Sequence, residues 1–180
     1  HYLPITIELG RSFVRPEYQS ANKGAKSIFA LDNLWDGLGA LTVLPPDAKY
    51  LLGKMTMYPS YQRECRDLLL HFLRLYFPDH KALVTPIEPL RPDTPAARTE
   101  HFFVGNDFKE DYRRLNQFIR SHGINIPPLV NAYMNLSPTM RFFGTAINHE
   151  FGEVEESGIY INIDEITDQK KSRHINTFEK

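Results

Sequence analysis

The chain has 180 residues, of which 42% are hydrophobic, so it can bury the core of one domain. Its 21 basic and 22 acidic residues give a net charge of −1, and the overall charge therefore predicts no nucleic-acid partner. Cys65 is the only cysteine, which excludes an internal disulfide and suits a reducing compartment. No apolar run approaches the roughly 18 residues of a membrane-spanning helix.

The first part of the chain alternates between strand and helix patterns. From Ile5, alternate residues are apolar, which predicts a strand with one apolar and one polar face. A helix is expected from about Ala25 to Pro45, then a strand over residues 50–58 that is apolar in both phases and so covered on both faces. Ser60 is the expected cap of a second helix that ends near Tyr76. This alternation predicts an α/β layer.

The second part opens on a possible short strand over residues 83–86 and then changes character. Four prolines between Pro86 and Pro95 predict an extended, exposed connection, which we place at about residues 86–99 and do not treat as a domain boundary. Asp107 is expected to cap a helix that ends near His122. The remaining expected elements are a short helix from Pro128 to Leu136, strands over residues 141–148 and 159–164, and a polar, frayed tail from Asp168 onward.

Several short motifs occur in an order that resembles a known family. The first is Glu8-Leu9-Gly10-Arg11-Ser12 followed by Val14-x-Pro16-x-Tyr18-Gln19. The later ones are Leu34-Trp35-x-Gly37-Leu38-Gly39, Tyr50-Leu51-Leu52-Gly53-x-Met55-Thr56 and Glu150-Phe151-Gly152. The set is similar to the hemolysin-type branch of the GNAT-like acyltransferases, which includes ornithine N-acyltransferases and N-acyl amino acid synthases. The opening motif also resembles a segment of acyl-homoserine lactone synthases.

The resemblance covers about residues 5–165 and implies a GNAT-like α/β fold, a mixed sheet flanked by helices. Residues 1–167 would be the C-terminal part of a single acyltransferase domain, and residues 168–180 a polar tail. Because the chain opens at His1 and enters a strand almost at once, we expect the N-terminal strands of the fold to be missing here. The opening strand would then have an exposed edge, which an upstream domain or a second chain is expected to cover.

The resemblance also implies a catalytic site on the opening strand, with the acyl-pantetheine arm between this strand and its neighbour. Gly10 is the expected position of a bulge that frees backbone N–H groups for the thioester carbonyl. Glu8 is the candidate base that removes a proton from the attacking amine. Arg11 would either orient Glu8 or bind the carboxylate of the acceptor. Without the resemblance, Glu8 and Arg11 are better interpreted as a structural ion pair at the rim of the sheet.

The segment that follows resembles the pyrophosphate loop of acetyltransferases, with Gln19, Asn22 and Gly24 at its characteristic positions. Asn22 replaces the first glycine of that loop, which weakens a site for free CoA and favours the single phosphodiester of a carrier protein. Arg15, Lys23 and Lys26 are candidates for meeting this phosphate or the acidic surface of the carrier. The alternative is a solvated, basic start of a helix.

Taken together, the resemblance predicts transfer of a long-chain acyl group from acyl carrier protein to the amine of ornithine or glycine, for aminolipid synthesis. Acyl-phosphopantetheine would be a co-substrate, with no permanently bound cofactor. The expected location is the cytoplasm, with a possible peripheral contact at the inner membrane. The alternative from another class is a non-catalytic, lipid-binding module.

Other reactive side chains give weaker indications. The seven histidines have no metal-ligand spacing, so no metal site is expected. Tyr160 is a candidate donor of a proton to the leaving thiolate, although its strand position favours a packing role. Cys65 lies on an apolar helical stripe and is expected in the core. The basic residues 170–174 could touch anionic lipid, but a solvated tail is the simpler interpretation.

Overall fold

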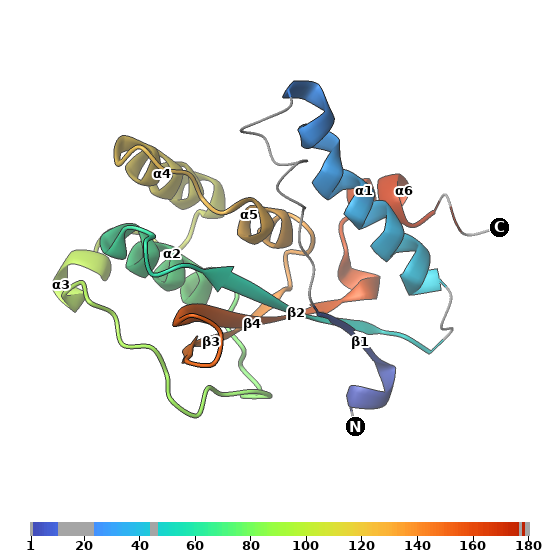
Figure 1. The fold of residues 1–180 in the computed structure, drawn as a ribbon, viewed down its shortest axis with the longest axis horizontal. Coiled ribbons are helices and arrows are strands. Elements are labelled where there is room, and N and C mark those ends of the chain that lie inside the picture. The colour runs from blue at the N-terminus through green and yellow to red at the C-terminus, as the bar shows by residue number, and fades with distance from the viewer. Residues whose placement is uncertain (1, 11–23, 44–46, 177, 179–180) are drawn as a thin grey trace. The chain divides into compact units, whose positions relative to one another are not determined.

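The computed structural model describes residues 2–10, 24–43, 47–176 and 178, with the side chains of residues 24–32 excepted. Four strands form one mixed sheet in the order β1-β2-β4-β3, and helices flank it (Figure 1). The expected fold class is confirmed. The chain divides into two compact units, one made of His1–Leu52 with Ile161–Lys180 and the other of Gly53–Tyr160.

The first unit is built around the start of strand β2 (Tyr50–Met57). Lys49, just before β2, donates its N–H to the Ile5 carbonyl and accepts from the Ile163 N–H, both at 2.9 Å. It therefore links the segment before β1 (Thr6–Leu9) to the end of β4 (Val154–Asn162). The other elements of this unit are the 3-10 turns η1 (Leu3–Ile5) and η3 (Ile163–Glu165) and the helices α1 (Gly24–Val43) and α6 (Asp168–His174).

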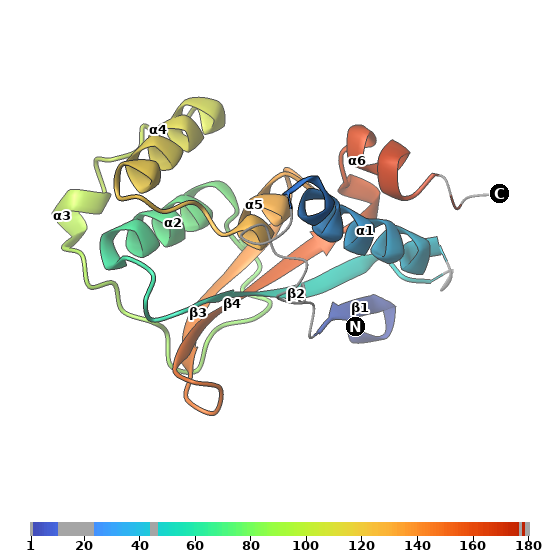
Figure 2. The same cartoon turned by 45° about the horizontal axis from the view of Figure 1, so that its top comes forward.

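Helices α1 and α6 lie side by side in both views (Figures 1 and 2). Gly39 of α1 is buried, and a Cβ at this position would lie 1.6 Å from the His174 carbonyl oxygen. The backbones approach this closely because position 39 has no side chain. Nδ1 of His174 also lies 2.6 Å from Oδ1 of Asp36.

The expectation of a frayed tail from Asp168 is therefore wrong. Residues 168–174 form a helix, and His174 and Ile175 at its end are buried. The reason is a contact between distant parts of the sequence. The segment is polar when considered alone, but its last residues pack where α1 presents a glycine.

The second unit packs α2 (Arg63–Tyr76) beside α4 (Phe108–Ser121), with the shorter helices α3 (Ala96–Thr99) and α5 (Pro128–Met134). Phe72 of α2 is the centre of an aromatic core. Its ring lies 4.7–6.2 Å from four other rings, those of Tyr76, Phe103, Phe108 and Tyr112.

A buried carboxylate also ties α2 to the segment before α4. Asp111 of α4 accepts the Tyr76 hydroxyl at 2.6 Å and the backbone N–H groups of Val104 and Gly105 at 3.0 and 2.8 Å. Burial would raise the pKa of Asp111, but these hydrogen bonds outweigh it and lower the pKa.

The starts of the two long helices of this unit differ in how well local sequence predicts them. Asp107 caps α4 as expected, because its side chain accepts the N–H groups of Lys109 and Glu110. The cap of α2 is Gln62 instead of Ser60, since the Gln62 side chain accepts the Cys65 N–H at 2.6 Å. The expected cap at Ser60 is therefore wrong by two residues.

Strand β2 buries only alternate residues, so the expectation that both its faces are covered is wrong. Leu51, Met55 and Met57 are buried on one face. On the other face Lys54 is exposed and pairs with Glu156 of β4 at 3.0 Å. Because Lys54 and Glu156 form a charged pair on this side, the second face of this apolar strand stays partly exposed to solvent.

Strands β3 (Arg141–Asn148) and β4 are antiparallel, and β3 has the expected bounds. Their register shifts between Phe142 and Thr145, so that Phe143 and Gly144 stand opposite Gly158 as a bulge. Gly144 has φ +94°, and a Cβ on it would lie 3.2 Å from the Pro86 ring. Strand β4 begins at Val154, five residues before the expected 159.

The Pro-rich connection runs beside the outer edge of β3. Leu90 donates its N–H to the Thr145 carbonyl at 2.8 Å, and Phe142 donates to the Phe77 carbonyl at 2.8 Å. The strand expected over residues 83–86 does not form. Leu83 donates its N–H to Oδ2 of Asp79 at 2.6 Å, and Pro86 has no N–H to donate, so a regular ladder is lost here.

Candidate functional site

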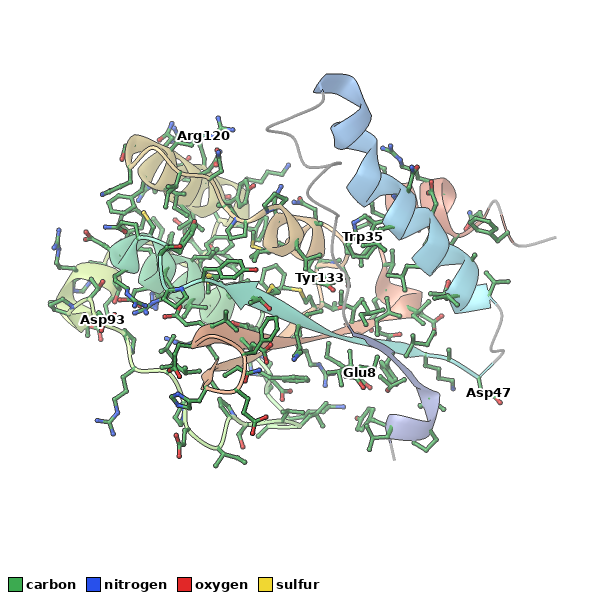
Figure 3. All side chains as sticks on the ribbon, viewed as in Figure 1. Glu8, Trp35, Asp47, Asp93, Arg120 and Tyr133 are labelled. Atoms are coloured by element: carbon green, nitrogen blue, oxygen red, sulfur yellow. The ribbon has the colours of Figure 1, made fainter. Side chains whose placement is uncertain are left out.

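The predicted catalytic strand is β1, which presents Glu8 to solvent while its neighbours Ile7 and Leu9 are half-buried (Figure 3). Gly10 follows the strand and is also exposed. A Cβ built on Gly10 would lie 4.0 Å from Oε1 of Glu8, so this carboxylate reaches along the strand toward the Gly10 backbone. The structure thus brings the candidate base beside the glycine at which the bulge is expected.

The other predicted site residues lie at or beyond the limit of the described structure. Arg11, Arg15, Gln19, Asn22 and Lys23 fall outside the described residues. Gly24 is the first residue of α1, and Lys26 is in the first turn with its side chain undescribed. A 20-residue helix therefore begins where the expected phosphate loop ends, and the N–H groups of a helix start favour an anion.

Tyr133 of α5 is a further candidate residue for the functional site, and the sequence did not lead us to predict it. It lies over strand β2 (Figure 3), and a Cβ on Gly53 would come within 2.9 Å of its hydroxyl oxygen. Burial raises the pKa of Tyr133 to about 12, so the hydroxyl stays protonated and able to donate a hydrogen bond. The only sequence signal was a glycine inside a strand, which often marks a close approach.

Two residues weighed as reactive groups lie in the core. Tyr160 of β4 is buried, and its ring centre lies 5.9 Å from that of Phe143. Cys65 is fully buried, and burial, with a smaller effect from the Glu64 charge, raises the pKa of its thiol to about 11. The prediction that Cys65 belongs to the core is confirmed.

A network of charged side chains inside the second unit was not predicted. Arg66 of α2 is only 1% exposed and donates to three carboxylates. The distances are 2.6 Å to Glu155 of β4 and 2.7 Å each to Asp67 and Asp93. Burial lowers the pKa of Arg66, but the hydrogen bonds and charges of Asp67 and Glu155 outweigh it, so the pKa is raised and the guanidinium stays charged.

Beside this network is an open cavity of about 490 Å³. Its walls come from the start of α2, the Pro-rich connection and the β3–β4 hairpin. The lining residues with charged or titratable side chains are Arg63, Arg66, Glu88, Arg91, Asp93, His149, Glu153 and Glu155. Figure 3 shows Asp93 next to α2 and α3. No local pattern predicts such a site, because its three walls are far apart in the sequence.

Neither a metal centre nor a membrane span is found in the described part of the chain. No three side chains of His, Cys, Asp or Glu among the described residues are grouped so that they could hold a metal ion. None of the described helices is long and apolar enough to cross a membrane.

Comparison with known proteins connects the chain to enzymes. A protein of Bacteroides thetaiotaomicron named glycine N(alpha)-acyltransferase is 63% identical over 177 residues, which are 98% of this chain and 52% of that protein. A protein of Phocaeicola vulgatus with the same name is 60% identical over 179 residues, 99% of this chain and 55% of that protein. Both relatives are acyltransferases by name. The chain spans about half the length of these curated relatives.

The other comparisons add no further relative. No model of a protein family matches the chain, and no solved structure matches it. The resemblance noted in the sequence is thus supported at the level of an acyltransferase, and its finer assignment to the hemolysin-type branch stays a prediction.

Proposed function

We propose that the protein containing this chain transfers a long-chain acyl group from acyl carrier protein to the amine of glycine. The observation that carries the proposal is the identity of 60–63% to two glycine N-acyltransferases over nearly the whole chain. Resemblance to the family leaves glycine and ornithine both open as acceptors. The names of the relatives favour glycine. The product, an N-acylglycine, would serve aminolipid synthesis.

In the proposed reaction the amine nitrogen of glycine attacks the carbonyl carbon of the acyl thioester. Glycine is an ammonium ion at neutral pH, so it must first lose a proton to gain a lone pair. Glu8, an exposed carboxylate beside Gly10, would accept this proton directly or through a water. The nitrogen of the tetrahedral intermediate then loses its second proton, the carbon–sulfur bond breaks, and the leaving thiolate takes up that proton to become a thiol.

Backbone N–H groups near Gly10 would stabilise the oxyanion of that intermediate, a contribution of roughly 10²–10³ in rate for one such donor. The acyl donor would approach past the start of α1, where Gly24 opens a long helix and Lys26 adds a positive charge. A carrier protein with an acidic surface and a single phosphodiester fits these features better than free CoA, because Asn22 replaces a loop glycine.

The test uses the full-length protein with acyl carrier protein carrying a long-chain thioester and a panel of amino acids. We expect thiol release and amide formation with glycine, and weaker or no turnover with ornithine. Glu8→Gln should lower kcat by about 10²–10⁴-fold in a folded protein. Glu100→Gln, which alters an exposed carboxylate at the end of α3, should leave kcat unchanged. Near-normal turnover of Glu8→Gln would exclude Glu8 as the base.

A lipid-binding module without catalysis is the competing proposal, and the same experiment decides between the two. If no amide forms with any acceptor from either acyl carrier protein or acyl-CoA, the acyltransferase proposal fails. Binding of the protein to lipid vesicles under those conditions would then favour the module.

A further inference from the structure

We propose that the cavity beside Arg66 is an amino-acid binding site, in which the ligand ammonium pairs with Glu155 and the ligand carboxylate with Arg63 and Arg91. That the bound amino acid is the acyl acceptor rests on the proposed function, whereas the binding itself does not. The carrying observation is the unequal use of the two carboxylate oxygens of Glu155.

The first step concerns hydrogen bonding. Oε1 of Glu155 accepts from Nη1 of Arg63 at 2.5 Å and from Nη1 of Arg66 at 2.6 Å. Oε2 of the same carboxylate is buried and has no hydrogen-bond partner among the described residues. Glu155 is only 3% exposed, and a buried acceptor without a donor is energetically unfavourable. An N–H group from a ligand would satisfy this oxygen.

The second step concerns charge. Three carboxylates, those of Asp67, Asp93 and Glu155, meet two guanidinium groups, those of Arg63 and Arg66. The cluster is therefore left with one negative charge, part of it in a buried position where an unbalanced charge is unfavourable. A cation would restore the balance. An ammonium group would supply this positive charge together with the N–H that Oε2 of Glu155 lacks.

The third step concerns the opposite end of the ligand. Arg91 lines the same cavity and is exposed, and Arg63 at its rim is about half exposed. Guanidinium groups bind carboxylates in a bidentate manner. A cavity wall with donors for a carboxylate and an acceptor for an ammonium is complementary to a zwitterion. A simple amine would leave the arginine donors without a carboxylate partner.

Hydrogen bonds within the protein hold part of the cavity wall in place. Oδ2 of Asp67 accepts the Thr94 N–H at 2.7 Å while Oδ1 of Asp67 holds Arg66, so the Pro-rich connection is anchored to α2. Such preorganisation lowers the entropy that binding must overcome. The side chains of Arg63 and Asp93 are more exposed, at 47% and 62%, and a rearrangement on this side would have to uncover the buried Oε2 of Glu155 for a ligand.

The size and apolar lining of the cavity predict broad tolerance. Its volume of about 490 Å³ lies in the range of small-molecule sites and exceeds the needs of glycine. Pro59, Pro89, Leu90 and Ile147 supply apolar surface beside the charged groups. We therefore expect alanine and valine to bind as well, so the choice of glycine in turnover would be made elsewhere.

The binding test uses calorimetry on the full-length protein without an acyl donor. We expect glycine to bind, and N-acetylglycine, which lacks the ammonium, to bind about tenfold or more weakly. Glu155→Gln and Arg91→Ala should each weaken glycine binding about tenfold or more. The matched controls are Glu156→Gln, next along β4 and paired with Lys54, and Arg98→Ala, an exposed arginine outside the cavity. Both should bind glycine like the wild type.

Several results would overturn the proposal. Absence of glycine binding would refute the proposed amino-acid site, and equal affinity for N-acetylglycine would exclude an ammonium site. Unchanged affinity in folded Glu155→Gln would do the same. If Glu155→Gln does not fold, Arg91→Ala and N-acetylglycine decide the matter, because the first changes an exposed residue and the second leaves the protein unaltered.

Turnover separates this proposal from the function on which it rests. For an active enzyme, we expect Glu155→Gln and Arg91→Ala to raise KM for glycine about tenfold with KM for the acyl donor unchanged. An active enzyme whose KM for glycine is unaffected would refute the cavity as acceptor site and leave the acyltransferase proposal intact. If the protein shows no turnover but binds glycine, and these variants abolish that binding, the cavity proposal is supported and the acyltransferase proposal fails.

Discussion

Replacing Gly39 by alanine is expected to separate α6 from α1, while the same change at Gly37, two residues away in α1, is expected to stabilise the helix. Both glycines lie inside α1, where alanine is favoured over glycine by about 1 kcal/mol. Apart from its chain neighbours and the backbone of its own helix, no atom of the described residues lies within 4 Å of a Cβ added at Gly37, so this gain is realised there. The pair thus differs only in what the new methyl group meets.

At Gly39 the added Cβ would lie 1.6 Å from the oxygen and 2.5 Å from the carbon of the His174 carbonyl. Real Cβ contacts are almost never shorter than 3.0 Å, and both neighbours are backbone atoms, so α6 must move away. Exposing Ile175 would cost about 1.5–3 kcal/mol, and losing the His174–Asp36 hydrogen bond about 1 kcal/mol more. After the helix gain of about 1 kcal/mol, we expect Gly39→Ala to lower the free energy of unfolding by about 1.5–3 kcal/mol.

Urea unfolding measures both variants against the wild type. Trp35, the only tryptophan, lies one turn before Gly39 on α1 (Figure 3), so its fluorescence reports on this unit. The midpoint should fall for Gly39→Ala and rise for Gly37→Ala. In a variant lacking residues 168–180, Gly39→Ala should become stabilising, because the obstacle is gone. If Gly39→Ala is as stable as Gly37→Ala in the intact chain, the packing of α6 on α1 is refuted.

Three further predictions concern the second unit. Gly53→Ala should lower the free energy of unfolding by about 1–3 kcal/mol, since its Cβ would meet the buried Tyr133 hydroxyl at 2.9 Å. An unchanged midpoint in urea unfolding would contradict that contact. Asp111 has a lowered pKa, so its contribution is present above its ordinary value of 3.8 and is lost as pH falls through the folded pKa. Asp111→Asn should therefore be less stable than the wild type near neutral pH. As the pH is lowered toward about 3, the urea midpoint of the variant should fall less than that of the wild type. Parallel pH profiles for the two proteins would argue against the lowered pKa. Cys65 should react with a thiol reagent only as fast as the protein unfolds, because burial raises its pKa to about 11, and rapid labelling of the native protein would show an open α2.

Elements that depend on neighbours in sequence were predicted well. Strand β3 has the predicted bounds, because apolar residues and flanking turns define it locally. Asp107 caps α4 as expected, since the N–H groups it accepts lie two and three residues ahead. In the candidate site, the proximity of Glu8 and Gly10 follows from their two-residue spacing, with Glu8 in β1 and Gly10 just after it.

Features that depend on distant contacts were missed. Helix α6 is polar and short, and its burial requires the gap that Gly39 leaves in α1. The buried position of Arg66 contradicts the usual exposure of arginine, and it is possible only because β4 and the Pro-rich connection bring carboxylates to it. The cavity depends on the same three segments, so no window of sequence could have revealed it.

The Pro-rich connection beside β3 determines where the sheet can grow. Leu90 and Phe77 already occupy backbone positions along the outer edge of β3, and the prolines around them have no N–H with which to continue a ladder. β1 is the strand at the other end of the described sheet, and a further strand that joined the sheet there would pair with β1. Such a strand would lie next to Glu8. Adding it to the sheet would therefore also change how easily other molecules reach this carboxylate.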